Sequence, residues 1–235
     1  MKRMVRAFVA ILAVVGVYQI VAMANGAAVP AGPSPSPSAS GMSRPLTPEE
    51  LAVEAYNSGI SRRDRAAKAE TQALKEKKDS DKLKNEKKAR EEYGKALKDF
   101  EKAAKLNPVM PQAYNGMGFS YRKLGDYQKA LENYDKALQL APKFPDAIEY
   151  RGEAYLALNR IDDAKQAYLT LFAMDRKQAD SLMAAMKDYV AKKKADPAGA
   201  DASALSALES WITERAGVAE QTKLMALNSQ HGSWR

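Results

Sequence analysis

The chain has 235 residues and a formal net charge of +8. It contains no cysteine, which excludes disulfides, cysteine-ligated zinc, thiol catalysis and a lipid-modified N-terminal cysteine. Its only histidine, His231, lies close to the C-terminal end, so a histidine-containing catalytic triad and a multi-histidine metal site are excluded as well.

The first element is an apolar segment of the type that directs export. Residues 1–6 carry three positive charges, and residues 7–24 form an apolar run interrupted by Gln19. Ala22 and Ala24 stand two apart at the end of this run, which is the pattern that signal peptidases accept. We therefore predict a signal peptide over residues 1–24 and an exported protein. Because a membrane span needs about 20 residues, an uncleaved anchor is the alternative.

Residues 25–46 form a linker rich in proline, serine and alanine. Such a stretch cannot bury enough apolar surface to fold, so we predict that it is extended or disordered. It would act as a spacer between the folded part of the chain and the membrane or the site of signal processing. Its prolines are Pro30, Pro33, Pro35, Pro37 and Pro45.

Residues 47–110 are predicted to form a long and highly charged pair of helices. The trio Asp79-Ser80-Asp81 offers side-chain oxygens for the N-cap of the returning helix, so we place the turn there. The outer end of this hairpin has too little apolar surface to pack against a neighbour, and we expect it to project. Between Arg62 and Lys105 the hairpin carries 16 basic and 10 acidic residues.

Residues 111–178 repeat with a period of 34 residues. So many matches at one offset are not expected from an amphipathic helix, whose pattern drifts with the 3.6-residue turn. The same offset carries Ala103 onto Ala137 and Pro108 onto Pro142, so the second helix of an earlier unit precedes residue 111. The matched positions are Pro111, Ala113, Gly118, Tyr121, Leu124, Ala130 and Tyr134, which recur as Pro145, Ala147, Gly152, Tyr155, Leu158, Ala164 and Tyr168.

The residue types at these positions fit a helix–turn–helix unit. Gly118 and Gly152 lie inside a helix, where glycine costs up to about 1 kcal/mol against alanine, so we expect a neighbouring helix to approach closely there. Gly125 and Asn159 suit the left-handed conformation that ends the first helix, and Pro142 stops the second. Small and bulky side chains between the helices are supplied by Ala130, Tyr134, Ala137, Ala164 and Tyr168, with Tyr121 and Tyr155 on the first helices.

These residues resemble the tetratricopeptide repeat (TPR) family, most closely from Tyr114 to Pro142. The resemblance covers residues 111–144 and 145–178, and part of residues 47–110. In the first unit, Gly59 corresponds to Gly118, with about 25 residues inserted at the turn. The resemblance implies an all-α fold, namely a TPR-type right-handed helical solenoid of about three repeats with an extended helical hairpin insertion in the first.

Residues 179–229 are predicted to be a pair of capping helices, because a solenoid must close its last repeat. Two apolar stripes at helical spacing are separated by a Pro-Ala-Gly break, and Asp201 or Ser203 would cap the second helix. We expect this helix to end near Leu227 and residues 230–235 to be frayed.

In TPR proteins the first helix of each pair lines a concave groove that binds a polypeptide, and the resemblance implies such a groove here. Some family members clamp a C-terminal carboxylate with lysine, asparagine and arginine. The corresponding positions are Tyr56, Ile60, Gly116, Asp146 and Tyr150, so we do not expect that clamp. The groove would favour an extended segment with a basic or polar patch at its acidic end. Its candidate residues are Tyr56, Asn57, Ile60, Arg63, Gln112, Asn115, Phe119, Arg122, Asp146, Glu149, Tyr150 and Glu153.

These features predict a non-enzymatic scaffold or adaptor that binds another polypeptide. We expect no catalytic residue, cofactor, metal or small-molecule substrate. With the export signal, the resemblance points to the bacterial cell envelope and to the periplasm, either free or anchored in the inner membrane. The basic hairpin leaves a second function open, in which it binds nucleic acid or an anionic cell-surface polymer.

Overall fold

The computed structural model describes residues 44–196 and 201–232, with side chains described up to Met225. The chain divides into two units, residues 1–43 and 44–235, and the helices described here belong to the second. The predicted signal peptide, the linker up to residue 43 and the end of the predicted frayed tail lie outside the described residues. In the part of the chain that is described, no helix combines the length and the apolar character that crossing a membrane requires.

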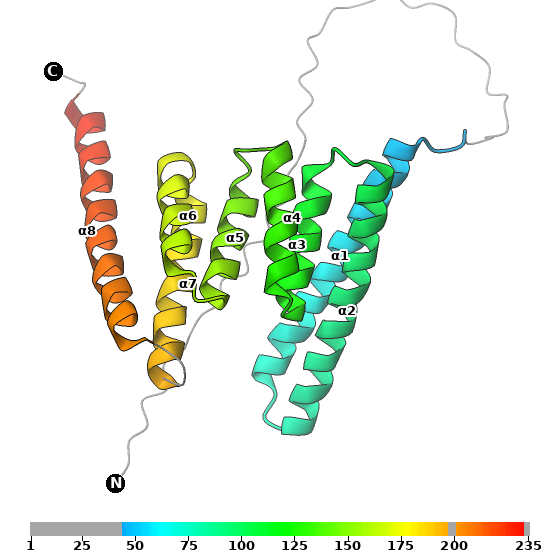
Figure 1. Cartoon of the computed structure of the whole chain (residues 1–235), viewed down its shortest axis with the longest axis horizontal. Helices are drawn as coiled ribbons and strands as arrows, with labels where there is room; N and C mark the ends of the chain where they lie inside the picture. Colours follow the sequence, from blue (N-terminus) through cyan, green and yellow to red (C-terminus); the bar gives the residue numbers. More distant parts are fainter. Residues whose placement is uncertain (1–43, 197–200, 233–235) are drawn as a thin grey trace, which may run out of the picture. The chain divides into compact units, whose positions relative to one another are not determined.

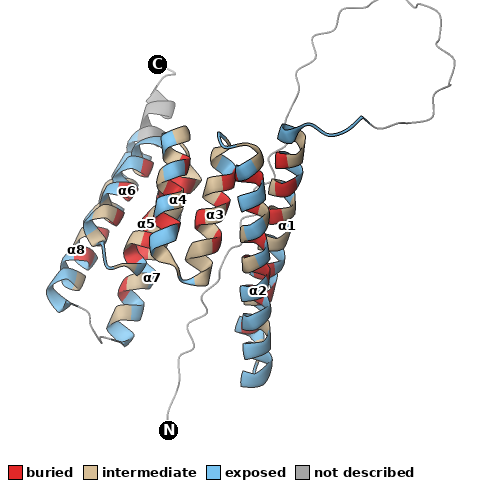
Figure 2. Ribbon diagram, turned by 45° about the vertical axis from the view of Figure 1, so that its right-hand side comes forward, coloured by how far each residue is buried: buried red, intermediate tan, exposed pale blue. Residues whose placement is uncertain are grey.

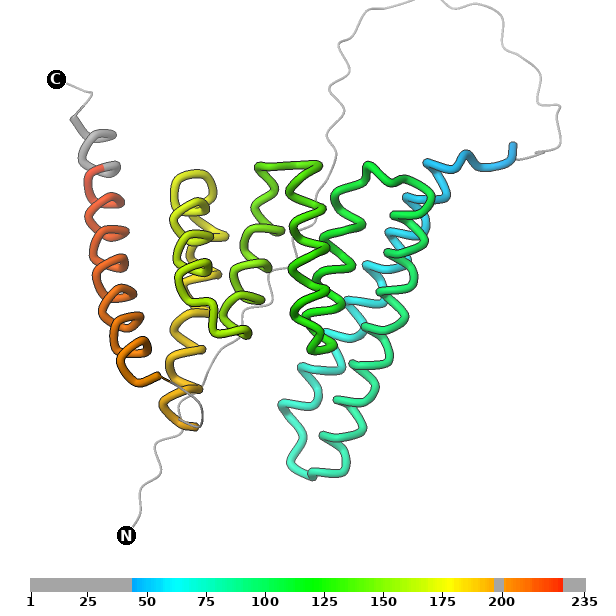
Figure 3. The backbone as a smooth tube through the Cα atoms, in the orientation of Figure 1, coloured from blue at the N-terminus to red at the C-terminus, as the bar shows by residue number. Residues whose placement is uncertain are grey.

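Every regular element within residues 44–196 and 201–232 is an α-helix, which confirms the predicted all-α fold. Helices that follow one another in the chain pack side by side in antiparallel pairs, in a TPR-like arrangement (Figure 1, Figure 3). The described helices are α1 (Pro48–Lys75), α2 (Asp79–Leu106), α3 (Pro111–Leu124), α4 (Tyr127–Leu140), α5 (Pro145–Ala157), α6 (Ile161–Met174), α7 (Arg176–Ala195) and α8 (Ala202–Gly232).

The long hairpin of α1 and α2 begins with a capping box. The Thr47 hydroxyl accepts a hydrogen bond from the Glu50 amide, and the Glu50 carboxylate accepts one from the Thr47 amide. At the start of α2 the N-cap is Lys78, without a side-chain hydrogen bond, so the prediction that Asp79-Ser80-Asp81 supply this cap is wrong. Because the helix begins at Asp79 itself, Asp79 and Asp81 lie in its first turn and oppose the positive end of the helix dipole instead.

Alanines line the contact between α1 and α2, and they allow the two helix backbones to approach closely. Ion pairs add to this contact, because the Arg62 Nε donates to Asp99 at 2.6 Å and the Arg65 Nε donates to Glu92 at 2.9 Å. The hairpin is therefore held together by small apolar contacts and by charged pairs at its sides. The buried alanines are Ala52, Ala55, Ala66, Ala69 and Ala73 of α1, with Ala89, Ala96, Ala103 and Ala104 of α2.

Glycines mark the closest approaches between helices. A Cβ atom at Gly118 of α3 would lie 2.6 Å from Cε1 of Tyr134 on α4, which confirms the close contact predicted for this position. Gly59 of α1 and Gly116 of α3 both lie against the ring of Phe100 on α2 in the same way. Phe100 stands one 34-residue period before Tyr134, and Gly59 contacts Phe100 as Gly118 contacts Tyr134. This equivalence identifies α1 as the displaced first helix of the first pair.

The third glycine contact uses a different helix. A Cβ atom at Gly152 of α5 would lie 2.6 Å from Cδ2 of Leu182 on α7, rather than against Tyr168 of its own pair. Tyr168 instead makes an edge-to-face contact with Trp211 of α8, with ring centroids 5.3 Å apart. The last repeat is thus closed by α7 and α8.

The turns follow the sequence pattern. Gly125 has a φ of 90° and Asn159 a φ of 57°, so both take the predicted left-handed conformation. α4 ends at Leu140, two residues before Pro142, which was expected to stop it. α2 ends at Leu106, two residues before Pro108, the equivalent proline one period earlier.

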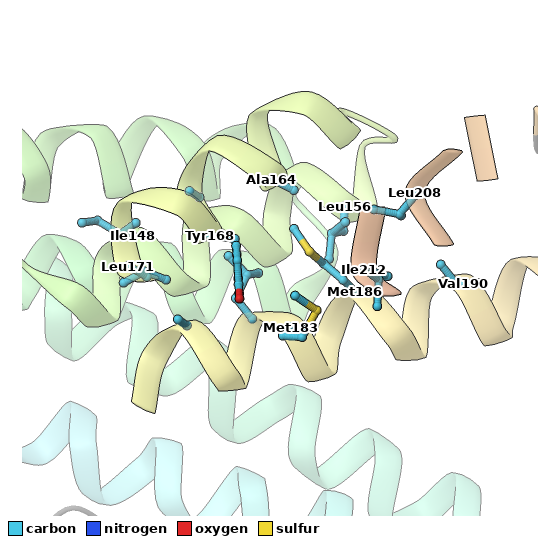
Figure 4. Close-up of a cluster of buried hydrophobic side chains, with 13 residues drawn as sticks. Ile148, Leu156, Ala164, Tyr168, Leu171, Met183, Met186, Val190, Leu208 and Ile212 are labelled. Atoms are coloured by element: carbon cyan, nitrogen blue, oxygen red, sulfur yellow. The ribbon is translucent and has the colours of Figure 1, made fainter. Parts of the chain in front are cut away.

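The C-terminal helices pack on α5 and α6 around one cluster of buried side chains (Figure 4). Asp201 accepts hydrogen bonds from the amides of Ser203 and Ala204 at 2.8 and 3.3 Å, so Asp201 caps α8. α8 continues to Gly232, past the position near Leu227 where its end was expected. The cluster contains Ile148, Leu156, Tyr168, Leu171, Leu182, Met186, Leu208 and Ile212 among others.

Candidate partner-binding face

The first helices of the three successive pairs, α1, α3 and α5, lie next to one another. On α3, Asn115, Phe119 and Arg122 follow at intervals of about one turn and therefore share one side of the helix. Arg63 of α1 and Tyr150 of α5 contact residues of this side. We call the surface defined by these five residues the first-helix face.

Aromatic rings and guanidinium groups join the three helices at this face. The rings of Phe119 and Tyr150 meet edge to face, with centroids 5.1 Å apart. The Arg122 guanidinium lies 5.1 Å from the centroid of Phe119 and 5.3 Å from that of Tyr150. Arg63 reaches Phe119 from α1, at 5.7 Å. Since cations are attracted to the electron-rich faces of rings, these contacts hold the half-buried rings in fixed positions.

Arg122 also forms an ion pair with Glu153 of α5. Burial opposes the charge of Arg122, but the neighbouring Glu153 raises the pKa of Arg122 above its ordinary value, and the guanidinium stays charged. The Arg122 side chain is 14% exposed and that of Glu153 is 27% exposed. This pair therefore links α3 to α5 near the surface, where a bound segment can reach it.

The other two acids of α5 are largely withdrawn from solvent. Glu149 is only 4% exposed, and burial together with the adjacent Glu153 raises the pKa of Glu149 so far that the carboxyl group is protonated at neutral pH. Burial and the neighbouring Asp175 raise the pKa of Asp146, which accepts a hydrogen bond from Gln178 of α7. The α5 end of the face, which the sequence predicts to be acidic, therefore carries less negative charge than its three acidic residues suggest.

Two polar atoms of the first-helix face are buried without a hydrogen bond. Asn115 Oδ1 and Arg122 Nε have no partner within the described part of the chain, although both residues lie on the side of α3 that carries Phe119. Both atoms are closed off from solvent, and the Arg122 guanidinium lies beside the buried Tyr134 hydroxyl of α4. A segment on the face therefore meets the rings of Phe119 and Tyr150 and the Arg122–Glu153 pair.

The remaining predicted residues lie around this face. Tyr56 is half-buried and packs against Phe100, with ring centroids 5.6 Å apart. Asn57 is exposed and lines a cavity of about 580 Å³ with Leu46 and Val53 near the start of α1. Ile60 is half-buried and Gln112 is exposed. The structure therefore brings Arg63, Asn115, Phe119, Arg122, Tyr150 and Glu153 together, and it leaves Asn57 and Gln112 at the periphery.

Sequence reasoning missed two residues that shape the face. Phe100 fills the space between Gly59 and Gly116, and its aromatic type one period before Tyr134 was the signal that could have identified it. Gln178 of α7 fixes Asp146, and no feature of the repeat predicted this contact because α7 departs from the 34-residue pattern.

The fold and this face define a helical repeat protein built from stacked antiparallel helix pairs. Within the described residues, no group of three or more His, Cys, Asp or Glu side chains is placed to hold a metal ion. Residues 111–144, which form α3 and α4, match the family model described as tetratricopeptide repeat. That helix pair is therefore a tetratricopeptide repeat.

Several solved TPR structures are similar to part of the chain. The Arabidopsis OM64 TPR domain is 19% identical and covers 57% of this chain and 96% of its own, with a TM-score of 0.40. The first TPR domain of human RPAP3 is 17% identical and covers 60% and 98%, with a TM-score of 0.41. The second TPR domain of human RPAP3, solved with the HSP70 peptide SGPTIEEVD, is 18% identical and covers 55% and 93%, with a TM-score of 0.39.

No curated protein sequence matches the chain. The kind of partner is therefore inferred from the side chains of the chain itself.

Proposed function

We propose that this protein is a non-enzymatic scaffold that binds an extended segment of a partner polypeptide on the first-helix face. The observation that carries the proposal is the cluster that three neighbouring first helices hold half-exposed at one surface. Phe119 and Tyr150 meet edge to face there, and the Arg122 guanidinium lies against both rings and pairs with Glu153. The cluster thus combines apolar rings with a charged pair that an extended segment can contact.

The surrounding side chains suit a polypeptide ligand. The half-buried rings of Phe119 and Tyr150 offer apolar contact area, and aromatic residues and arginine dominate the binding energy of protein interfaces. Glu153 and Asp146 lie at one end of the face, so the segment is expected to place a basic or polar side chain there. A basic side chain of the segment that pairs with Glu153 competes with Arg122 for the Glu153 carboxylate.

The proposed place of action is the bacterial cell envelope, with the helical part in the periplasm. This part of the proposal is supported by the sequence of residues 1–24, which has the charged start, apolar run and small-residue end of a signal peptide. An uncleaved segment would keep the protein on the inner membrane, with its helical part in the periplasm. Cell fractionation with N-terminal sequencing of the purified protein distinguishes the two forms, and an intact Met1 in the cytosol contradicts both.

The binding proposal is tested by site-specific crosslinking in cells. A photoreactive amino acid at the position of Gln112, which is exposed beside the face, should trap one polypeptide. The same group at Lys136, exposed on the second helix α4, is the matched control. Asn115→Ala should then weaken binding of the purified partner at least fivefold, whereas Lys136→Ala should not. Unchanged affinity in both Asn115→Ala and Phe119→Ser contradicts the proposal.

A further inference from the structure

The α1–α2 hairpin extends beyond the end of the helix pair that packs on it (Figure 1). Arg90 Nη2 donates to the carbonyl oxygen of Leu124 at 3.3 Å, and Lys123 pairs with Glu70 at 2.6 Å, which sets the level at which α3 ends. Residues 79–89 of α2 lie past this level, a length of about 16 Å at 1.5 Å per residue. Figure 2 shows that this end of the hairpin is largely exposed.

A cavity of about 380 Å³ occupies the inner corner between the side of the hairpin and the end of α3. We call this corner the ledge. Its floor includes the buried Tyr93, whose hydroxyl donates to Glu70 at 3.0 Å. The ledge is lined by Leu83, Glu86, Lys87, Ala89, Arg90 and Tyr93 of α2, Glu70 of α1 and Lys123 of α3.

Two leucines are exposed at this end of the hairpin, and one of them, Leu83, lines the ledge. Leu83 is 64% exposed although it lines the cavity. Leu74 is 70% exposed and lies four residues after Glu70, so it stands one helical turn further along the side of α1 that faces α3. In the repeats, a neighbouring helix covers the corresponding side of each first helix, and here that helix is absent because α3 has already ended. We take Leu83, which lines the ledge, together with Leu74 as the exposed apolar side chains of this end of the hairpin, and we call them the apolar strip.

The charges available at the ledge are basic. Glu70 is already satisfied by Lys123 and by the Tyr93 hydroxyl, and Glu86 lies 4.0 Å from Lys82. Among the described residues, Lys87 has no ion pair or hydrogen bond, and Arg90 is bonded to a backbone carbonyl and to no carboxylate. Lys84 and Lys88 nearby are likewise unpaired within the same residues. The corner thus combines uncovered leucine with uncompensated positive charge.

We propose that the ledge is a second docking surface, which binds an amphipathic, acidic segment of a partner polypeptide. The segment places apolar side chains on Leu83 and Leu74 and carboxylates near Lys87 and Arg90, and it continues the line of helices where α3 ends. The ledge adjoins the first-helix face, because Tyr93 of its floor packs against Phe119 with ring centroids 6.0 Å apart. Its exposed residues Leu83 and Lys87 lie past the end of α3, so one molecule can hold a segment at each surface. The inference does not depend on what occupies the first-helix face.

The shape of the ledge selects this occupant over other anionic ones. A bilayer surface is flat on this scale and does not enter an inner corner closed by the end of a third helix. Nucleic acid is bound mainly through its phosphates, and exposed leucines contribute nothing to phosphate contacts. A polypeptide helix or strand satisfies both the apolar strip and the charges.

The test uses the purified full chain and a fluorescein-labelled synthetic peptide of sixteen residues, with leucine at helical spacing and glutamate at the remaining positions. Fluorescence anisotropy should show saturable binding that Leu83→Ser and Leu74→Ser each weaken about fivefold or more. Lys87→Glu should weaken it by a similar factor and reduce its salt dependence. Leu169→Ser and Lys136→Glu alter a leucine and a lysine that are exposed on α6 and α4, and they should leave it unchanged.

Three results would overturn the proposal. One is that the native chain does not bind the peptide, or binds it with an affinity less than twofold different from that of Leu83→Ser. Another is equal binding of a peptide with lysine in place of glutamate. The last is a stronger, Leu83-dependent association with vesicles of anionic phospholipid or with single-stranded DNA than with the acidic peptide. Asn115→Ala serves as an internal reference, because it is expected to weaken binding at the first-helix face and should not affect binding of the peptide at the ledge.

Discussion

Gly118 of α3 lies so close to Tyr134 of α4 that the tyrosine ring occupies the space of a side chain at residue 118. The Tyr134 ring is fully buried there, and it also contacts the ring of Tyr150 on the next helix, with centroids 6.3 Å apart. A glycine of one helix pair therefore sets the packing of the following pair as well.

Gly118→Ala is expected to destabilise the protein by about 1–3 kcal/mol, because the added methyl group must displace a buried ring. The matched control is Gly94→Ala on α2, where a Cβ atom would meet nothing within 4 Å. That substitution should stabilise the protein by about 0.5–1 kcal/mol through the higher helix propensity of alanine. Thermal unfolding followed by circular dichroism measures both changes, and shifts of the same sign in the two variants would be inconsistent with this packing.

Phe100→Ala is expected to be the more damaging change. The fully buried ring fills the space between two glycines, which have no side chain to occupy the cavity, and the expected loss is about 3–5 kcal/mol. For a domain of this size that corresponds to a fall in the unfolding temperature of about 10 °C. Leu169→Ala, at a leucine that is 38% exposed on α6, should change the unfolding temperature by a small amount only.

Glu149→Gln should change how stability depends on pH. The folded protein holds the Glu149 proton more tightly than the unfolded chain, in which the carboxyl has an ordinary pKa of about 4.3. Stability contributed by the protonated form is therefore present below that value and is lost progressively as the pH rises, by at most about 1.4 kcal/mol per pH unit.

Glutamine at this position has no proton to lose. The variant and the native chain should unfold at similar temperatures near pH 5, and the variant should be increasingly the more stable of the two toward pH 8. Asp146, whose pKa is also raised, is present in both proteins and cancels in the comparison. Parallel pH profiles would rule out a buried neutral carboxyl at residue 149.

Alanine at Glu149 or at Glu153 should weaken binding of a partner segment that carries a basic side chain. Glu153→Ala acts directly, because it removes the exposed carboxylate of the pair with Arg122. Glu149→Ala acts through the packing of α5, since that side chain is buried, and Glu149→Gln should retain most of the affinity. Titration calorimetry with the recovered partner compares the three variants, and equal affinities would place the binding site elsewhere.

Most of the fold could be predicted because the residues that recur with the 34-residue period are the ones that determine how the helices pack. The glycine at 118, the left-handed residues at 125 and 159 and the proline at 142 each have one structural explanation, and the structure agrees with it. The start of α2 could not be placed as well, because both Lys78 and the acids that follow are compatible with a helix start.

The candidate face was harder to predict than the fold. A one-turn spacing placed Asn115, Phe119 and Arg122 together, but no spacing shows that Glu149 is buried while Glu153 remains accessible. That difference depends on the tertiary packing of α5, which also includes contacts of Asp146 with Gln178 and of Gly152 with Leu182 on α7, outside the repeat. The 34-residue period does not predict contacts between α5 and α7, because α7 is not part of the repeat.

The contacts of Glu70 with Lys123 and of Arg90 with Leu124 have a consequence for how the hairpin can vary. They tie the hairpin to the end of α3, so only the part between them and the turn is anchored at one end. Removing the same number of whole helical turns from α1 and from α2 would bring the end of the hairpin level with the end of α3. The packing of the stacked helix pairs would stay intact. The length of the hairpin is thus independent of how the helix pairs pack, and the hairpin can be lengthened or shortened without changing that packing.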